Sequence, residues 1–114
     1  MTRLVCIESP LHGDTKADRE RNERYLDACM ADCFRRGEAP FASHAIYTRV
    51  LDDDVPEQRK QGIDAGLAWA CRADARVVYE DLGISRGMFE GIEHAKGIRQ
   101  TIECRQLGGE WAKR

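Results

Sequence analysis

The chain of 114 residues is 42% hydrophobic and 33% charged, an ordinary composition for a soluble globular protein of one domain. Its net charge of −2 and pI near 5.9 lack the basic excess of duplex-binding proteins, so nucleic acid is not an expected partner. No run approaches the roughly 18 apolar residues of a membrane span. The sequence enters a strand-like run directly after Met1-Thr2-Arg3. We therefore expect no membrane partner, no signal peptide and a cytoplasmic location.

The sequence contains five cysteines and no Cys-x-x-Cys pair. Cys29 and Cys33 are four residues apart and could share a metal on a helix, but no further ligands are evident. We interpret all five as small buried side chains in a reducing compartment, and we expect neither a metal nor a cofactor. They are Cys6, Cys29, Cys33, Cys71 and Cys104.

The apolar run at residues 4–7 predicts a central strand buried on both faces. The loop after it, residues 8–14, is polar and rich in turn-forming residues. It is either a loop that cradles a ligand, with the backbone closest at Gly13, or a plain turn. Residues 14–36 then predict a helix, because apolar side chains from Tyr25 onward recur along one stripe.

A short second strand at residues 39–44 contains Pro40, which predicts a place away from the centre of the sheet. His44 at its carboxyl end is a proton shuttle, a base-stacking residue or a loop histidine bonded within the protein. The connection at residues 45–53 is long enough to act as a flap over a site. In the acidic run at residues 52–54, one side chain is expected to cap the next helix and the others to favour its positive end.

A second helix is predicted at residues 55–73, because Pro56 fits the first turn of a helix and apolar residues follow at helical spacing. Glycines on the same side would permit close approach to the sheet. The expected buried stripe and its glycines are Ile63, Leu67, Ala70 and Cys71 with Gly62 and Gly66.

Residues 75–97 combine a buried strand, a short loop and a third helix, and the rest of the chain is organised around them. The run at residues 77–79 predicts the strand, and Ser85 stands where a helix N-cap belongs. Gly87 leaves the backbone N–H groups of residues 86–88 uncovered. Such a helix start is a binding site for a phosphate or another anion.

A last strand is predicted at residues 99–104, which completes a domain at residues 1–107 and leaves a frayed tail at residues 108–114. The βαβαβαβ order predicts an α/β fold: a single flavodoxin- or Rossmann-like domain with about four parallel strands and helices on both faces. If the sheet winds outward from the first strand, the first and third strands are neighbours. The crevice between the loops after them is then the binding site.

Residues 66–79, followed by Ser85-x-Gly87 and Ala95, resemble the nucleoside 2-deoxyribosyltransferase family, which includes deoxynucleoside 5′-monophosphate N-glycosidases. The resemblance extends from Arg3 to Cys104. It is closest to an uncharacterised phage and bacterial branch, which shares five short motifs with the chain. These motifs are Pro40-Phe41, His44, Asp52-Asp53-Asp54, Gly62 to Leu67, and Ile84-Ser85-Arg86-Gly87-Met88.

The resemblance implies that a glutamate on the third helix attacks the anomeric carbon of a deoxyribose while the base leaves with proton assistance. The two carboxylate positions that it implies fall on Gly91 and Gly66 in this chain. Glu90 lies one residue early, about 100° around a helix, and therefore points elsewhere unless a bulge turns it inward. Asp81 is the other carboxylate considered for catalysis.

The sequence thus favours a non-catalytic protein that binds a small-molecule nucleotide or nucleoside and possesses the anion site without the usual glutamate. Sequestration of a nucleotide-derived signal would suit such a protein. One alternative is an N-glycosidase or deoxyribosyltransferase, and another is a structural protein without a ligand. We expect a homo-oligomer, a dimer or larger, because the family completes its pocket with a neighbouring subunit and the small sheet has open edges. The candidate ligand-binding residues are Ser9, Pro10, His12, Gly13, His44, Asp81, Gly83, Ser85, Arg86, Gly87 and Met88, and the candidate catalytic residue is Glu90.

Overall fold

The computed structural model of the protein describes residues 1–113 and has alternating strands and helices, as the sequence predicts. Element ends differ from the predicted ones by a few residues. In chain order the elements are β1 (Leu4–Glu8), α1 (Lys16–Arg35), β2 (Ala39–Phe41), the 3-10 helices η1 (Ser43–Ala45) and η2 (Tyr47–Arg49), α2 (Pro56–Ala70), β3 (Ala75–Tyr79), α3 (Arg86–Gly97), β4 (Thr101–Arg105) and the 3-10 helix η3 (Gly109–Lys113).

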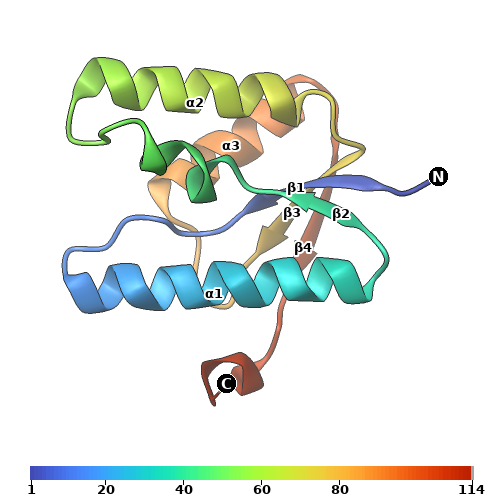
Figure 1. Ribbon diagram of the computed structural model, residues 1–114. Coiled ribbons are helices and arrows are strands. Elements are labelled where there is room, and N and C mark those ends of the chain that lie inside the picture. The colour runs from blue at the N-terminus through green and yellow to red at the C-terminus, as the bar shows by residue number, and fades with distance from the viewer. Residues whose placement is uncertain (114) are drawn as a thin grey trace.

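The four strands form one parallel sheet in the order β2-β1-β3-β4. Helix α1 covers one face, and α2 and α3 cover the other (Figure 1). The predicted α/β architecture is confirmed, including the position of β2 at a sheet edge. Because β1 and β3 are central neighbours, their carboxyl ends and the loops after them lie together at one edge of the sheet.

The face of the sheet toward α1 holds the main hydrophobic core. Val5 and Ile7 of β1 and Val77 of β3 are at most 2% exposed, and they pack in one cluster with the buried side chains Tyr25 and Cys29 of α1. Alternation along each strand explains this set, since every second residue points to the same face. This cluster joins α1 to the two central strands.

The opposite face of the sheet is polar near its centre. Cys6, Glu8 and Arg76 alternate with the core residues and therefore point toward α2 and α3. Arg76 is fully buried there, and its guanidinium donates to Gly91 O of α3 at 2.5 Å. A buried arginine inside the apolar strand β3 needs hydrogen-bond acceptors on this face. Glu8 of β1 and the backbone of α3 at Gly91 supply them.

The cysteines divide into two groups. Cys6, Cys29 and Cys33 are buried as predicted, whereas Cys71 and Cys104 are exposed, contrary to the prediction. Cys71 follows the last residue of α2 and Cys104 lies on the edge strand β4, so neither reaches the core. Within residues 1–113 no group of three or more His, Cys, Asp or Glu side chains is arranged to hold a metal ion.

Helix α2 differs from the prediction at its start and along its stripe. No side chain caps it: Val55 is the N-cap residue, and Asp52 instead accepts from the N–H of Asp54 at 2.9 Å. Ile63 is 43% exposed and Cys71 is also exposed, so the predicted stripe is wrong at both positions. The sheet face is met by small residues of α2 instead, and space remains beneath the helix. The buried residues of α2 are Gly66 and Ala70.

The segment after β4 is ordered in the described residues rather than frayed. The Trp111 ring of η3 packs 4.9 Å from the Tyr25 ring, centroid to centroid, and the main core cluster includes it as a partly buried member. The predicted tail extended to Arg114, which lies outside the described residues. No helix among residues 1–113 has both the length and the apolar character needed to cross a bilayer.

Candidate functional site

A cavity of about 390 Å³ lies at the carboxyl end of β1, on the side of the sheet that α2 and α3 cover. Its lining comes from the end of β1 and the loop after it, from η1 and η2, from one side of α2 and from the first turns of α3. This is the predicted crevice beside β1 and β3, and the volume suits a small molecule.

The start of α3 forms one wall of this cavity. Ser85 is the N-cap residue, as predicted, and its Oγ accepts from Met88 N–H at 3.2 Å. The prediction of three uncovered amides is therefore wrong at Met88. The N–H groups of Arg86 and Gly87, in the first turn, have no intrahelical acceptor and are directed to the outside of the helix end.

The most buried charged pair of the cavity joins β1 to β3. Arg76 Nη1 donates to Glu8 Oε2 at 3.1 Å, and Arg76 Nη2 donates to His94 Nδ1 at 3.0 Å. Glu8 is 17% exposed and lines the cavity, while Arg76 is completely buried behind it. Burial raises the pKa of Glu8 to about 7, although the charge and hydrogen bond of Arg76 act in the opposite direction.

Gly91 of α3 gives the Glu8 carboxyl the space that it occupies. A Cβ atom at position 91 would lie 2.5 Å from Glu8 Cδ, closer than real Cβ contacts permit. The position at which the resemblance implies a carboxylate is therefore filled by a carboxyl group from another element. Gly66, the second such position, is likewise closely covered, because a Cβ there would lie 2.5 Å from Ser43 Oγ of η1.

His44 in η1 faces the end of β1. Its Nε2 forms a hydrogen bond with Ser9 Oγ at 3.0 Å. Burial lowers the pKa of His44 to about 4, and the nearby His12 adds to the lowering. His44 is thus a neutral imidazole at pH 7, bonded within the protein and lining the cavity.

Charged side chains from three segments meet at another part of the lining. Arg59 Nη1 of α2 lies 2.8 Å from His12 Nε2 in the β1–α1 loop, and the same His12 nitrogen lies 3.3 Å from Asp53 Oδ2. These contacts tie the loop after β1 to the connection between η2 and α2. They hold a cation, Arg59, in the lining of the cavity.

Most of the predicted site residues line this cavity, but not all of them do. Those that line it are Ser9, His12, His44, Ser85, Arg86, Gly87, Met88 and Glu90. Those that do not are Pro10, Gly13, Asp81 and Gly83. Whether the lining residues bind a ligand stays a prediction.

Two of the predicted site residues that do not line the cavity have clear structural roles. Asp81 accepts from Tyr25 O–H at 2.6 Å and from the N–H groups of Leu107 and Gly108, so its carboxylate turns to the α1 side of the sheet. Gly13 permits close approach to the start of α1 rather than to a ligand, because a Cβ there would collide with Asp18. Asp81 therefore does not line the cavity, and its role at a site stays a prediction.

Sequence reasoning missed three residues that shape the cavity. One signal was present: an arginine inside the apolar strand 75–79 requires a buried acceptor, and Glu8 is the acidic residue that ends the neighbouring strand. No signal in the sequence joins η1 to α2. The missed residues are Glu8, Ser43 and Arg59.

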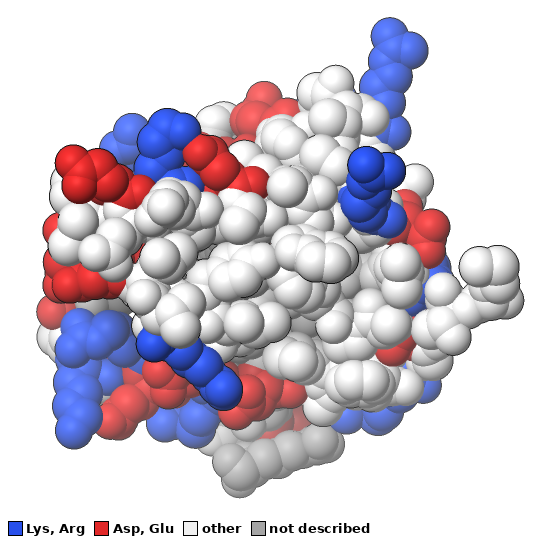
Figure 2. Space-filling view, turned by 45° about the horizontal axis from the view of Figure 1, so that its top comes forward, with Lys and Arg blue, Asp and Glu red and all other residues white. Residues whose placement is uncertain are grey.

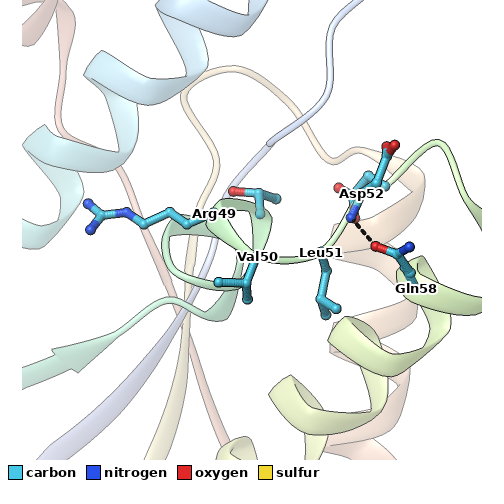
Figure 3. Close-up of a pocket in the computed structure, with 7 residues that line it drawn as sticks. Arg49, Val50, Leu51, Asp52 and Gln58 are labelled. Atoms are coloured by element: carbon cyan, nitrogen blue, oxygen red, sulfur yellow. Dashed lines mark hydrogen bonds between the residues drawn. The ribbon is translucent and has the colours of Figure 1, made fainter.

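A second hollow adjoins this site on the outside of the η2–α2 connection (Figure 3). Asp52 N–H donates to Gln58 Oε1 at 2.7 Å, and Figure 3 shows Arg49 extending away from that bond. Other polar groups of the hollow bond to residues beyond it, since Thr48 Oγ1 donates to His44 O at 3.2 Å and Asp52 Oδ1 accepts from Asp54 N–H at 2.9 Å. The hollow shares Thr48 and Asp53 with the main cavity and has no separate set of converging groups.

Comparison with known proteins places the chain in a family. No curated protein matches the sequence. The sequence model of one family, described as a domain of unknown function (DUF7768), matches residues 3–105. The match runs from just before β1 to the end of β4 and so includes the whole sheet and the cavity. The chain therefore belongs to the DUF7768 family of domains of unknown function.

Proposed function

We propose that the protein binds a nucleotide or nucleotide-derived small molecule in the cavity beside β1 and α3. The observation that carries the proposal is the meeting of a 390 Å³ cavity with the first turn of α3 at the carboxyl end of the central strand β1. Free amides at a helix start favour an anion, and the cavity gives the rest of the ligand a place to enter.

The charges in the cavity suggest how such a ligand would lie. The Glu8 carboxylate would repel a phosphate from the end of β1. The amides of Arg86 and Gly87 would attract one to the start of α3. Gly87 and Gly91 are one helical turn apart, about 6 Å along the axis. A single pentose can span that distance, so a 5′-phosphate at Gly87 would bring the sugar beside Glu8.

Titration calorimetry with adenosine, guanosine, cytidine and thymidine 5′-monophosphates tests this proposal. The double variant Ser85→Ala, Gly87→Val should weaken binding at least about tenfold, because it removes the cap and covers the amides. Gly97→Val at the other end of α3 is the matched control, since a Cβ there meets no atom within 4 Å. Equal affinity in all three proteins would contradict the placement of the phosphate.

A second candidate function is cleavage of an N-glycosidic bond, and one observation favours it. A carboxyl group does stand over position 91, although it comes from Glu8 of β1 and not from α3. Glu90 is a poorer candidate because its side chain is 60% exposed and lies 3.5 Å from Arg86 Nε.

Release of free base from deoxynucleoside monophosphates distinguishes the two functions. Binding without release favours the non-catalytic protein, in which the cavity sequesters its ligand. Release that is lost in Glu8→Gln and kept in Glu90→Gln favours the enzyme. If neither binding nor release is observed, with cyclic dinucleotides also tested, the result favours a structural or interaction protein.

We also infer that the protein forms homo-oligomers. Trp69 of α2 lies outside the cavity lining and is 61% exposed, and β2 and β4 are the edge strands of the sheet. In Figure 2 the middle of the face turned toward the viewer is largely uncharged, with charged side chains around it. Light scattering coupled to gel filtration measures the mass, and a monomer at high concentration would contradict the inference.

A further inference from the structure

The carboxyl group of Glu8 is only half used by the protein. Its Oε2 accepts from Arg76 Nη1 at 3.1 Å, whereas Oε1 forms no hydrogen bond with the groups that the structure describes. The side chain lines the cavity and retains 17% exposure. A carboxyl group with one oxygen fixed and the other facing a cavity is positioned to bond to whatever enters.

Gly91 leaves room for this carboxyl group because it has no side chain. Glu8 Cδ would lie 2.5 Å from a Cβ at position 91, and both carboxyl oxygens would also be too close. Arg76 reinforces the arrangement, because the same Nη1 that bonds to Glu8 also donates to Gly91 O at 2.5 Å. Strands β1 and β3 and helix α3 thus define one position for the carboxyl group.

We propose that Glu8 is the acid–base group of the cavity, exchanging a proton as a ligand enters, and that Gly91 is the positioning residue that admits its carboxyl group. The proposal deepens the proposed binding of nucleotides and rests on that function only for the identity of the ligand. Burial raises the pKa of Glu8 to about 7, so both forms are present near neutral pH. The neutral form donates a hydrogen bond through Oε1 and the ionised form accepts one.

Arg76 is the charged group that acts most directly on the pKa of Glu8. Behind Arg76, His94 of α3 is held neutral, since burial and then the guanidinium charge lower its pKa. Helix α2 places glycine and apolar residues opposite Glu8 and contributes a charge only through Arg59. The titratable groups in the lining, besides Glu8, are Cys6, His12, His44, Tyr47, Asp53, Arg59, Arg86 and Glu90.

An anion that enters the cavity should draw a proton onto Glu8, because a second negative charge disfavours the carboxylate. The proton comes from the solvent and is carried on a carboxyl oxygen, and no covalent bond of the ligand changes. Binding near pH 7 should therefore be accompanied by net proton uptake.

Carbon-13 NMR of the ligand-free protein tests the acid–base role without any nucleotide. The Glu8 carboxyl resonance, assigned by its loss in Glu8→Gln, should titrate with a midpoint near 7. A midpoint at the ordinary glutamate value, between 4 and 5, would overturn the role. Gly97→Ala at the open end of α3 should leave the midpoint unchanged.

A double-mutant cycle tests the positioning role of Gly91. Gly91→Ala should shift the unfolding equilibrium by about tenfold or more, because the new Cβ overlaps the Glu8 carboxyl group. In a Glu8→Ala background the same substitution should cost much less. An equal cost in both backgrounds would overturn the positioning role, even where Gly91→Ala alone is too unstable to assign by NMR.

Calorimetry with adenosine 5′-monophosphate, in two buffers of different ionisation enthalpy at pH 7, tests the exchange. The expected result is proton uptake that is lost in Glu8→Gln, a comparison that cancels the titration of the phosphate itself. Equal uptake in both proteins overturns the exchange. If none of the nucleotides binds, the proposed function fails, whereas the ligand-free titration still decides whether Glu8 is an acid–base group.

Discussion

The two faces of the sheet are built from the same strands and differ in what they hold. Toward α1, Val5, Ile7 and Val77 join a continuous apolar core. Toward α2 and α3, Glu8 and Arg76 form a buried ion pair beside a cavity. Alternation along β1 and β3 thus lets one face supply cohesion while the other keeps polar groups and space.

The helices follow the same division. Helix α1 contributes large buried side chains such as Tyr25 and Leu26, whereas the buried residues of α2 are Gly66 and Ala70. Small residues cannot fill the space between α2 and the sheet. The cavity is therefore present because α2 has no large buried side chain. We expect substitutions on the two faces to affect stability and binding in different proportions.

The largest effect should come from breaking the ion pair on the cavity face. Arg76→Met leaves Glu8 as a buried carboxylate without a partner, which should cost about 3 to 5 kcal/mol of unfolding free energy at pH 8. Urea denaturation at that pH measures it. The companion variant Arg76→Met, Glu8→Gln should recover much of the loss because no unpaired charge remains. A double variant as unstable as the single one would show that Arg76 acts through packing or through its bonds to α3.

The sequence predicts the elements of both faces well, because unbroken apolar runs mark β1 and β3 and Ser85 marks the start of α3. It predicts the cavity face less completely. Asp81 follows a strand, as site carboxylates do, but Tyr25 and the backbone after β4 draw it to the α1 side. Glu8 enters the site through the space over Gly91, and such a gap between distant segments is not visible in a linear pattern.

Two leucines compare the packing of the faces directly. Leu26→Ala, at a side chain only 6% exposed in the α1 core, should cost about 3 kcal/mol. Leu67→Ala, at the half-buried lining of the cavity, should cost about 1 kcal/mol, because part of its surface already meets open space. Thermal and urea denaturation measure both, and equal costs would mean that the two faces are packed alike.

The last effect depends on pH and concerns two titrating groups of the cavity that oppose each other. The pKa of Glu8 is raised to about 7, so its contribution to stability is full below its ordinary value of 4.5 and is lost as the pH rises through 7. The pKa of His44 is lowered to about 4, so its contribution is full above 6.5 and is lost as the pH falls through 4. Between pH 4.5 and 6.5 the two largely cancel.

Single variants should reveal each contribution, with changes of about 1 to 2 kcal/mol across that window. Glu8→Gln removes the group that favours low pH, so its unfolding free energy should fall more steeply on acidification than that of the wild type. His44→Gln removes the opposing group, so its unfolding free energy should fall as the pH rises toward 7. Urea denaturation at half-unit steps measures both slopes. Three parallel curves would mean that neither group is held in its neutral form by the cavity, and the polar face would then owe its character to Arg76 alone.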